Sequence, residues 1–408
     1  MADVIQDSTY SDLLWIPEST LGTTPATGAA YRLNATNAPI RLERNRERPN
    51  VWSRSRRPHP SRIVSKKGSV EVTAPLQYLN MAPLHEAFFG AATGTPVEVT
   101  GTGIAFVEDT TDTITDTGNG LAVFLLGYMV HVSGAGEDDN NGWKGPVLAT
   151  AAGTLTIPDG QIVDESAGES ITLHCTPLLD GETETSGTMQ WHATKLDYRR
   201  NMAGTKVDVW GLNWQGEQYI NERFAMMGRA PTKASAIIGN SIASGYPQAS
   251  DFFTSADDLK KIYIGNSALG NVELCLSELS FAAQNNREAI MQLNLGQPKD
   301  YIFGQLFAEW AAQAYADGTA ESIADAIDAD DTFYAYATME DPDGNGVAIF
   351  TPACKGIGDL LPGERNTKVR FADVRFDAHD PAKDASSDFY NSGTGPGFMV
   401  GAFFRPAP

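Results

Sequence analysis

The alternation of apolar and polar residues predicts a β-strand followed by a short helix over residues 67–90. Val70 and Val72 alternate with polar residues, which is the period of a half-buried strand. The strand ends at an Ala-Pro pair, because proline cannot donate to a central ladder. In the helix that follows, Pro83 suits the first turn and Gly90 can close the last one.

A second unit with the same order of signals is predicted at residues 289–313. Its strand carries Met291, Leu293 and Leu295 at alternate positions and ends at a Gly-Gln-Pro break. The helix predicted next has an apolar stripe of Ile302, Leu306 and Trp310. An Ala-rich helical stretch is expected over residues 309–328.

Two further stretches resemble each other, residues 205–214 and 367–376. Their apolar positions match one for one: Val207 with Val369, Val209 with Phe371, Leu212 with Val374 and Trp214 with Phe376. In both stretches the alternation changes parity midway, which one inserted β-bulge residue would produce. Because two stretches repeat in the same order, an internal duplication is favoured over chance similarity of short strands.

Residues 100–176 differ in character, because short apolar runs alternate there with turn-rich segments. Five short strands are predicted, at residues 123–126, 129–132, 145–148, 155–157 and 171–173. Their spacing fits a small β-barrel. The second half has no such segment, so it is interpreted as an accessory domain inserted into a loop, where insertions cost least.

The predicted fold is therefore mainly β. A first domain comprises residues 1–99 and 177–238, interrupted by the insert of residues 100–176. A Gly/Ser-rich linker spans residues 239–250, and a second domain spans residues 251–408.

Composition narrows the function further. The chain has 408 residues, enough for two or three cored domains, and a net charge of −21, which disfavours a surface that clamps DNA or anionic lipid. Cys175, Cys275 and Cys354 are widely spaced and suit small core residues in a reducing compartment. No signal peptide or membrane-spanning run is evident, so folding in a cytoplasm is expected.

One stretch is basic, residues 41–67. Its prolines make it a poor helix, so an extended arm or hairpin is predicted. A nucleic-acid patch is one interpretation, but in so acidic a chain an arm that meets acidic surface on the same assembly is favoured. The arginines expected at an oligomer interface are Arg41, Arg44, Arg46, Arg48, Arg54, Arg56, Arg57 and Arg62.

No pattern supports catalysis, a cofactor or a metal. Asp341, Asp343 and Asn345 imitate the start of a calcium loop, but Pro352 stands where a bidentate Glu is needed, so a hairpin turn is favoured. The histidines show no metal-ligand spacing, and no nucleophile elbow or phosphate-binding loop is present.

Several segments together resemble the tail tube (major tail) proteins of long-tailed bacteriophages. They are Glu18-Ser19-Thr20-Leu21-Gly22-Thr23-Thr24-Pro25, Gly68-Ser69-Val70-Glu71-Val72, Phe88-Phe89-Gly90, Thr351-Pro352-Ala353-Cys354-Lys355 and Phe376-Asp377-Ala378-His379-Asp380. The insert is similar to small β-domains that decorate some of these proteins, at Gly127-Tyr128-Met129-Val130-His131-Val132-Ser133-Gly134 and Asn140-Asn141-Gly142.

The resemblance implies two tandem tail-tube-like β-sandwich domains, each with a packed helix, in a structural virion protein of the tail. Such proteins polymerise as stacked rings into a tube that conducts phage DNA without binding it specifically. A ring of six single tube domains would need three of these chains, so a trimer with pseudo-sixfold symmetry is expected rather than a hexamer. The insert is expected to project outward, and its removal to leave assembly intact.

Other partners implied are further tail proteins, with no membrane involved. Two alternatives remain open. One is another virion structural protein, such as a capsid decoration or baseplate protein. The other is a carbohydrate-binding β-protein that uses the insert as its binding module.

Overall fold

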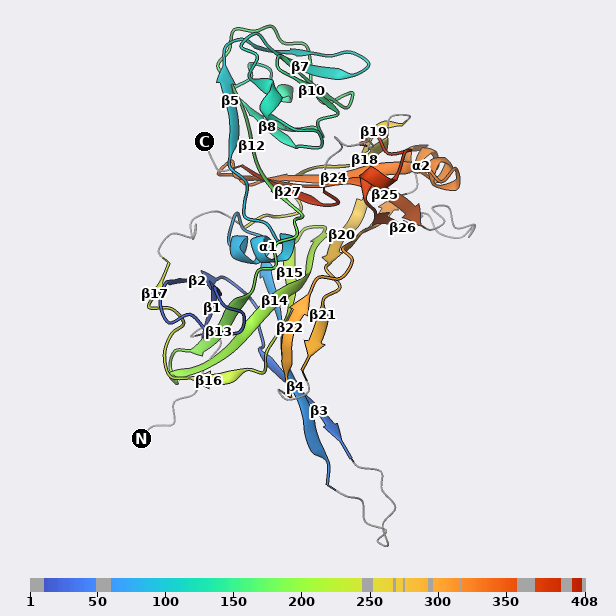
Figure 1. The fold of residues 1–408 in the computed structure, drawn as a ribbon. Coiled ribbons are helices and arrows are strands. Elements are labelled where there is room, and N and C mark those ends of the chain that lie inside the picture. Colours follow the sequence, from blue (N-terminus) through green and yellow to red (C-terminus); the bar gives the residue numbers. More distant parts are fainter. Residues whose placement is uncertain are drawn as a thin grey trace.

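A computed structural model describes residues 11–48, 60–243, 252–266, 269–273, 276–292, 296–315, 318–357, 371–389 and 398–405. Strands dominate these residues, and the α-helices among them are α1 (Ala82–Phe89) and α2 (Gly318–Asp328). The predicted mainly β class is confirmed. In Figure 1 an upper lobe, a flat middle layer and a lower sheet with a projecting hairpin follow one another.

The first half forms two sheets that share one strand. Its elements are β1 (Ser11–Pro17), β2 (Ala29–Leu33), β3 (Arg41–Glu47), β4 (Arg62–Pro75), β13 (Gly187–Ala193), β14 (Tyr198–Gln215), β15 (Asn221–Gly228), β16 (Thr232–Ala234) and β17 (Ser241–Ile242). One sheet has the order β2-β1-β13-β14, and the other has the order β14-β15-β4-β3. The long strand β14 belongs to both.

Helix α1 lies where the sequence predicts it. Gly90 ends the helix in the left-handed region, with φ at +64°, which glycine adopts without a Cβ clash. The buried rings of Phe88 and Phe89 pack against Trp210 of β14, with ring centroids 5.9 and 5.4 Å apart. The helix therefore packs against β14, the strand that the two sheets share.

The second half repeats this pairing order. Its elements are β18 (Leu259–Asn266), β19 (Gly270–Glu273), β20 (Leu276–Gln284), β21 (Glu288–Met291), β22 (Pro298–Ile302), β23 (Phe307–Tyr315), β24 (Thr332–Glu340), β25 (Gly346–Ile357), β26 (Phe371–Ala378) and β27 (Gly401–Arg405). Its sheets run β19-β18-β24-β25 and β25-β26-β23-β20, and α2 lies between β23 and β24 in the chain. Each strand thus has a counterpart: β1 with β18, β2 with β19, β3 with β20, β4 with β23, β13 with β24, β14 with β25 and β15 with β26.

A shared irregularity supports this correspondence. The β13–β14 ladder shifts register between Gly187 and Met189, and the β24–β25 ladder shifts between Phe333 and Ala335. Both shifts place one extra residue on the second strand of the pair.

Strands β14 and β20 join the halves into one sheet. They pair antiparallel from Val209 opposite Gln284 to Gln215 opposite Glu278. Beneath this junction Trp214 of the first half stacks on Trp310 of the second, with ring centroids 6.2 Å apart and planes within 16°. One hydrophobic core therefore runs through both halves.

The helix predicted on Ile302, Leu306 and Trp310 is wrong. Ile302 ends β22, and β23 runs as a strand through Trp310. Ala308, Trp310 and Ala312 are buried at alternate positions, which is strand periodicity, and the helix begins only at Gly318. By pairing order, β4 and α1 therefore correspond to β23 and α2. The repeated strand–helix unit of the second half spans residues 307–328 rather than the predicted 289–313.

The predicted bulge is confirmed in the first copy and absent in the second. The β14–β15 ladder shifts between Val207 and Val209, whereas the sequence predicted the shift between Val209 and Leu212. Strand β26 keeps continuous register with β23 from Phe371 to Asp377. By topology β26 corresponds to β15 rather than β14, so the one-for-one match of residues 205–214 with 367–376 does not follow the fold.

The insert is built from two packed sheets, and its described residues form no closed barrel. The sheets are β10-β11-β7-β6 and β5-β12-β8-β9. Their strands are β5 (Val97–Gly101), β6 (Ile104–Val107), β7 (Asp112–Asp116), β8 (Val130–Ser133), β9 (Gly142–Lys144), β10 (Ala149–Ala151), β11 (Thr154–Ile157) and β12 (Ile171–Leu179). The strand predicted at residues 123–126 is instead a 3-10 turn, Leu121–Val123, and the loop after it.

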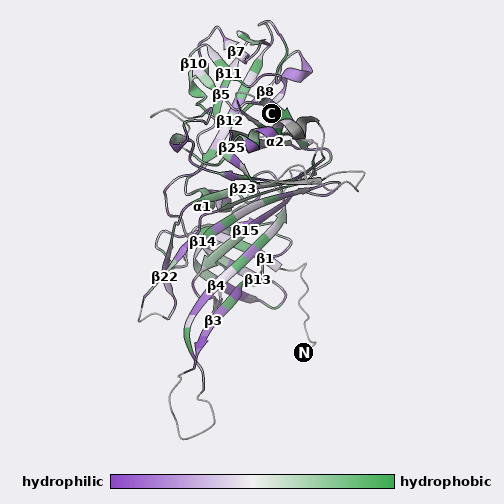
Figure 2. Cartoon of the chain, turned by 90° about the vertical axis from the view of Figure 1, so that its right-hand side faces the viewer, coloured by the Kyte–Doolittle hydropathy of each residue, from purple (hydrophilic) through white to green (hydrophobic). Residues whose placement is uncertain are grey.

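The middle layer β24-β25-β27 is buried on both faces. Alternate residues point down into the core shared by the two halves, or up into the core of the insert. The downward set includes Ala335, Ala337, Met339, Val347, Ile349, Ala402 and Phe404, and the upward set includes Tyr334, Tyr336, Ala348, Phe350 and Phe403. Figures 1 and 2 show the insert directly above this layer.

The insert is therefore joined to the second half by both pairing and packing. Strand β12 leaves the insert and pairs with β27 through Thr176 opposite Phe404, so one strand connects insert and layer. Trp143 of β9 donates its indole N–H to the carbonyl of Met339 on β24 at 3.2 Å. The insert is thus one of the two covers of a buried sheet, which argues against its being dispensable.

The cysteines agree with a reduced, packed interior where they are described. Cys175 and Cys354 are free and buried, and burial raises the pKa of both thiols. Cys275 lies outside the described residues. The structure describes only part of the predicted linker, because residues 244–250 also lie outside the described residues.

We expect a variant with residues 100–176 replaced by a short Gly/Ser linker to be strongly destabilised. The deletion would expose Tyr334, Tyr336, Phe350 and Phe403, whose burial contributes about 1.5–3 kcal/mol for each large apolar side chain. Thermal unfolding and binding of a hydrophobic dye measure the effect. A soluble deletion variant that unfolds at the wild-type temperature would contradict the conclusion that the insert covers one face of the buried middle layer.

Candidate assembly surfaces

The continuous sheet that joins the halves ends in unpaired backbone on both sides. At one end β3 pairs with β4 along one edge, and its other edge has no partner among the described residues. At the other end, the β24 ladder stops at Lys355, and Gly356 and Ile357 pair with β26 alone. Ile357 is 51% exposed there. Unpaired strand edges are templates for pairing with another chain.

The basic stretch forms the predicted hairpin where it is described. Strands β3 and β4 pair from Arg41 opposite Ser69 to Glu47 opposite Arg62, and the ribbon projects from the body in Figure 1. Figure 2 colours its strands mainly hydrophilic. Of the predicted interface residues, Arg41, Arg44, Arg46, Arg48 and Arg62 are exposed on this arm, whereas Arg54, Arg56 and Arg57 lie outside the described residues.

The described arm is mixed in charge rather than purely basic. Glu43 and Glu47 alternate with its arginines, and Lys67 forms an ion pair with Glu43 at 3.0 Å. Hydrogen bonds from Ser69 and Lys67 lower the pKa of Glu43. The arm can therefore offer both signs of charge to a neighbour.

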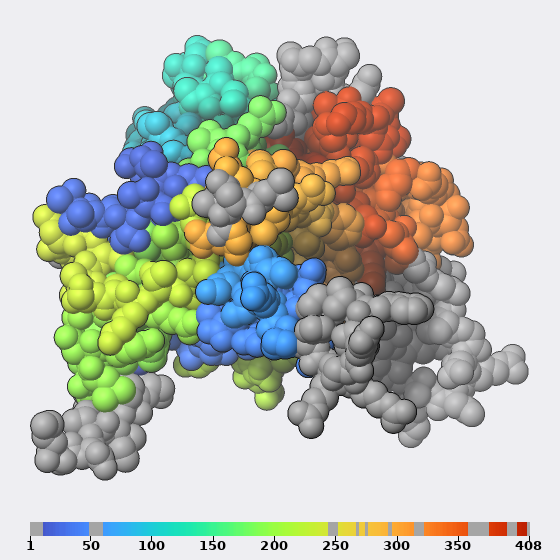
Figure 3. Space-filling view, turned by 60° about the horizontal axis from the view of Figure 1, so that its bottom comes forward, coloured from blue at the N-terminus to red at the C-terminus, as the bar shows by residue number. Residues whose placement is uncertain are grey.

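A second hairpin, β21–β22, lies beside the arm. The Lys66 N–H of β4 donates to the Gly296 carbonyl at the turn of this hairpin, at 2.9 Å. In Figure 3 the blue arm and the orange hairpin meet at the face turned toward the viewer. The two hairpins expose Ile63, Val64, Ile290, Met291 and Ile302 at 38–52%. Both polar and apolar contacts are therefore available at this end of the molecule.

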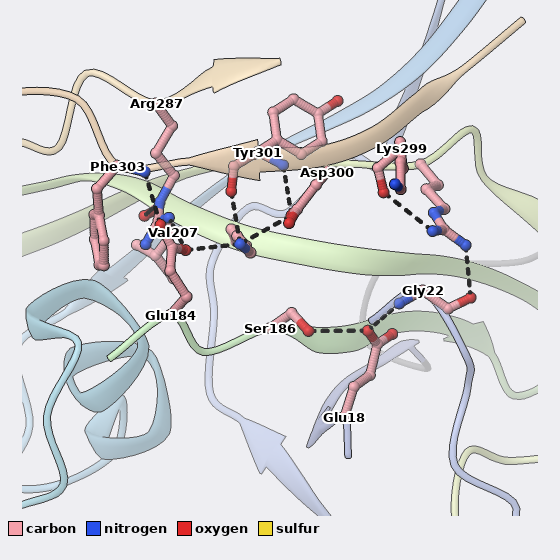
Figure 4. A network of polar contacts seen from close by, with 12 residues as sticks. Glu18, Gly22, Glu184, Ser186, Val207, Arg287, Lys299, Asp300, Tyr301 and Phe303 are labelled. Atoms are coloured by element: carbon pink, nitrogen blue, oxygen red, sulfur yellow. Dashed lines mark hydrogen bonds and ion pairs between the residues drawn. The ribbon is translucent and has the colours of Figure 1, made fainter. Parts of the chain in front are cut away.

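A charge cluster, with buried cations and partly exposed carboxylates, fixes the second hairpin to the first half, as Figure 4 shows. The Lys206 ammonium of β14 contacts Glu184 at 2.7 Å and Asp300 of β22 at 2.9 Å. Arg287, fully buried, contacts the same Glu184 carboxylate at 2.7 Å and donates through Nε to the Val207 carbonyl at 2.7 Å.

Backbone contacts complete the cluster. The Asp208 carboxylate accepts the backbone N–H of Arg287 at 2.8 Å, and Glu184 accepts that of Phe303 at 2.7 Å. Burial raises the pKa of Glu184, but the Lys206 hydrogen bond and the Arg287 charge outweigh it, so its pKa lies below the usual range. The carboxylate is thus ionised at neutral pH and holds two cations.

Sequence reasoning missed Glu184, Lys206 and Arg287. A signal did exist: Asn286-Arg287-Glu288 repeats the tripeptide Asn45-Arg46-Glu47 of the arm. The predicted arginines are not part of this cluster, because all those described are exposed on the arm.

The face of the continuous sheet opposite the core is polar, and several of its charges are paired. Arg223 contacts Glu71 across β15 and β4 at 2.6 Å, and Arg375 contacts Glu309 across β26 and β23 at 3.6 Å. By register, the described cations on this face are Arg41, Lys67, Arg223, Lys355 and Arg375, and the carboxylates are Glu43, Glu71, Glu278, Glu309 and Asp377. The net charge of −21 therefore does not arise from these residues.

The calcium-like segment is a hairpin turn between β24 and β25. Asp341 accepts the Asn345 backbone N–H at 2.7 Å and the Asn345 side-chain amide at 2.8 Å, so the aspartate is used to close the turn. Within the described ranges, no cluster of His, Cys, Asp and Glu is arranged to hold a metal ion.

No helix among the described residues is long and apolar enough to cross a membrane.

Comparison with known families gives one match. The family model described as "Phage tail tube protein" matches residues 11–378. That span includes both repeated halves, the insert and the arm. A search of curated proteins found no match.

We expect Glu184→Gln to reduce the free energy of unfolding by about 3 kcal/mol, because it leaves Arg287 and Lys206 buried with fewer compensating charges. Chemical denaturation measures the change. Glu182→Gln, at an exposed neighbouring position, is the control and should change little.

The pH dependence has a definite sign. The pKa of Glu184 is depressed in the folded state, so its contribution is present above its unfolded pKa and is lost as pH falls through the folded value. The stability difference between wild type and Glu184→Gln should therefore shrink as the pH drops below about 4. A constant difference down to pH 3 would show that the carboxylate does not hold the cluster.

Proposed function

The chain belongs to the phage tail tube protein family, and from that membership we propose that it polymerises as stacked rings into the tube that conducts the phage genome. The family is a structural one, and its members are components of the virion tail. Assembly in the host cytoplasm and contacts with other tail proteins at the tube ends form part of the proposal.

The pairing of β14 with β20 is the observation that carries this proposal. It joins two halves of equivalent strand order edge to edge, and among the described residues one edge of β3 and one edge of Gly356–Ile357 have no partner strand. Since β3 is the counterpart of β20, and β25 that of β14, a second copy can continue the sheet by repeating the internal junction. Repetition of one heterologous contact closes into a ring when the rotation allows it.

Ring size follows from treating each half as one tube domain. The two halves then occupy two positions of a six-position ring, and three chains close it with pseudo-sixfold symmetry. The internal β14–β20 contact alternates with the contact between chains around the ring. The insert, on the opposite side of the middle layer from the polar sheet face, then lies on the outside as three knobs.

The polar face of the continuous sheet suits the wall of a DNA channel. A wall that held DNA by free cations would release counterions on binding and retain the duplex. Here Arg223, Arg375 and Lys67 are each matched with a carboxylate, so little free positive charge remains. The β21–β22 hairpin, at one end of this sheet, is placed to contact the adjacent ring.

Electron microscopy of concentrated purified protein tests the proposal. We expect stacked rings whose reconstruction contains three chains, with three external knobs per ring, because each chain carries two equivalent halves. A reconstruction with six chains and six knobs per ring would contradict the ring geometry. Protein that forms no rings or tubes under any condition would contradict the function.

The channel wall makes a separate prediction. We expect a Glu43→Gln, Glu71→Gln, Glu309→Gln variant to bind double-stranded DNA about tenfold more tightly than wild type at low salt, with a steeper salt dependence, because three cations lose their partners. Filter binding measures both. A variant with three exposed carboxylates of the insert neutralised, Glu108, Asp109 and Asp138, is the control of equal charge. Equal DNA binding by the two variants would contradict the assignment of this face.

A further inference from the structure

The buried charge cluster of the first half has an incomplete counterpart in the second. Lys206 pairs with Glu184 at 2.7 Å, and Lys355 pairs with Asp330 at 2.8 Å. The two pairs occupy equivalent places in the fold. Lys206 follows Thr205, which lies opposite Gly187, and Lys355 follows Cys354, which lies opposite Phe333.

The carboxylates also occupy equivalent places. Glu184 precedes Gly187 by three residues, as Asp330 precedes Phe333 by three. Their surroundings differ in one respect. Glu184 binds Arg287 as well as Lys206, whereas the Asp330 side chain is 82% exposed, and its ion pair in the described part of the chain is with Lys355.

The missing guanidinium has a counterpart on the arm. Arg287 lies within Asn286-Arg287-Glu288, directly after β20, and the same tripeptide, Asn45-Arg46-Glu47, lies on β3. The two tripeptides are in matching register with their hairpin partners. Glu47 pairs opposite Arg62 as Glu288 pairs opposite Ile302, and Glu43 lies opposite Lys67 as Gln284 lies opposite Phe307.

Arg46 is free to act outside its own chain. Arg46 is exposed on the projecting arm, and it takes part in none of the ion pairs among the described residues. Arg287, in contrast, is fully buried and uses its Nε on the Val207 carbonyl and its Nη1 on Glu184. The same side chain in the same motif is thus buried in an ion pair in one half and exposed in the other.

A junction between copies that repeats the internal one would have specific contacts. At the internal junction the Asn285 N–H donates to the Asp208 carbonyl at 2.8 Å. The equivalent bond between two copies runs from the Arg44 N–H to the Ile357 carbonyl of the next chain. The equivalent of the bond from Arg287 Nε to Val207 then runs from Arg46 to the Gly356 carbonyl, and it brings the guanidinium to Asp330.

We propose that Arg46 of one copy completes the charge cluster of its neighbour by pairing with Asp330 beside Lys355. The assignment rests on the proposed ring and specifies the residues of its contact between chains. The Arg46 guanidinium becomes buried as Arg287 is, and the exposed Ile357 is covered by the incoming β3 strand. At both kinds of junction around the ring, one carboxylate then binds one lysine and one arginine.

A charge exchange tests the pairing. We expect Arg46→Asp to raise the protein concentration needed for tube assembly by about tenfold, since a charge is reversed within a desolvated pair. Asp330→Arg should do the same. The double variant should assemble within about threefold of wild type, because the exchanged charges attract again and the two substitutions are coupled rather than additive.

Arg62→Asp is the matched control. Arg62 lies on the same arm and carries the same charge, but its counterpart Ile302 stays 43% exposed at the internal junction. Its reversal should leave the assembly concentration unchanged. Melting temperatures of unassembled chains show that each variant is folded, and Arg46→Gln with Asp330→Asn provides a milder second pair.

The assembly results distinguish a failure of the Arg46–Asp330 contact from a failure of the proposed tube function. Assembly of Arg46→Asp at the wild-type concentration overturns the contact while leaving the tube function in place. Failure of the double variant to recover, or an equal defect in Arg62→Asp, also overturns it. If the wild type itself forms no rings, the proposed function fails and the contact fails with it.

Discussion

The hydrogen bonds between β14 and β20 place both halves of the chain in a single sheet, and the other features depend on that arrangement. The pairing aligns Trp214 over Trp310, which makes one core of two. It turns the polar faces of both halves to the same side and, within the residues that the structure describes, leaves an unpaired edge at each end. Backbone groups at those edges need partners, so the geometry that makes the chain one unit also prepares it for assembly.

The middle layer imposes the second constraint. A sheet buried on both faces needs two covers, and here α1 and the lower sheets supply one while the insert supplies the other. The insert is therefore part of the folding unit, although it enters through one loop of the first half. The Glu184 cluster has a similar role below the layer, because it ties the β21–β22 hairpin to β14, in addition to the bond from the Lys66 N–H to the Gly296 carbonyl.

Much of the fold could be predicted from local pattern, and the failures have physical causes. Val70 and Val72 lie on a half-buried strand, so alternation identified it. Ile302, Leu306 and Trp310 were mistaken for a helical stripe because they recur every four residues, whereas Ala308, Trp310 and Ala312 are buried at the spacing of a strand. The unbroken apolar run from Phe333 to Ala337 marks a strand buried on both faces, a pattern typical of double burial. The charge cluster could not be found from spacing, since Glu184, Lys206 and Arg287 meet only in the folded chain. The repeated Asn-Arg-Glu tripeptide was the available clue.

Hydrogen–deuterium exchange on assembled tubes and on unassembled chains tests the central claim that β3 pairs with the next copy as β20 pairs with β14. Peptides covering β20 should exchange slowly in both states, because that strand is paired on both edges within the chain. Peptides covering Arg41–Glu47 should exchange rapidly in free chains and slowly in tubes. Exchange in β3 that stays equally fast in tubes and in free chains would contradict the account.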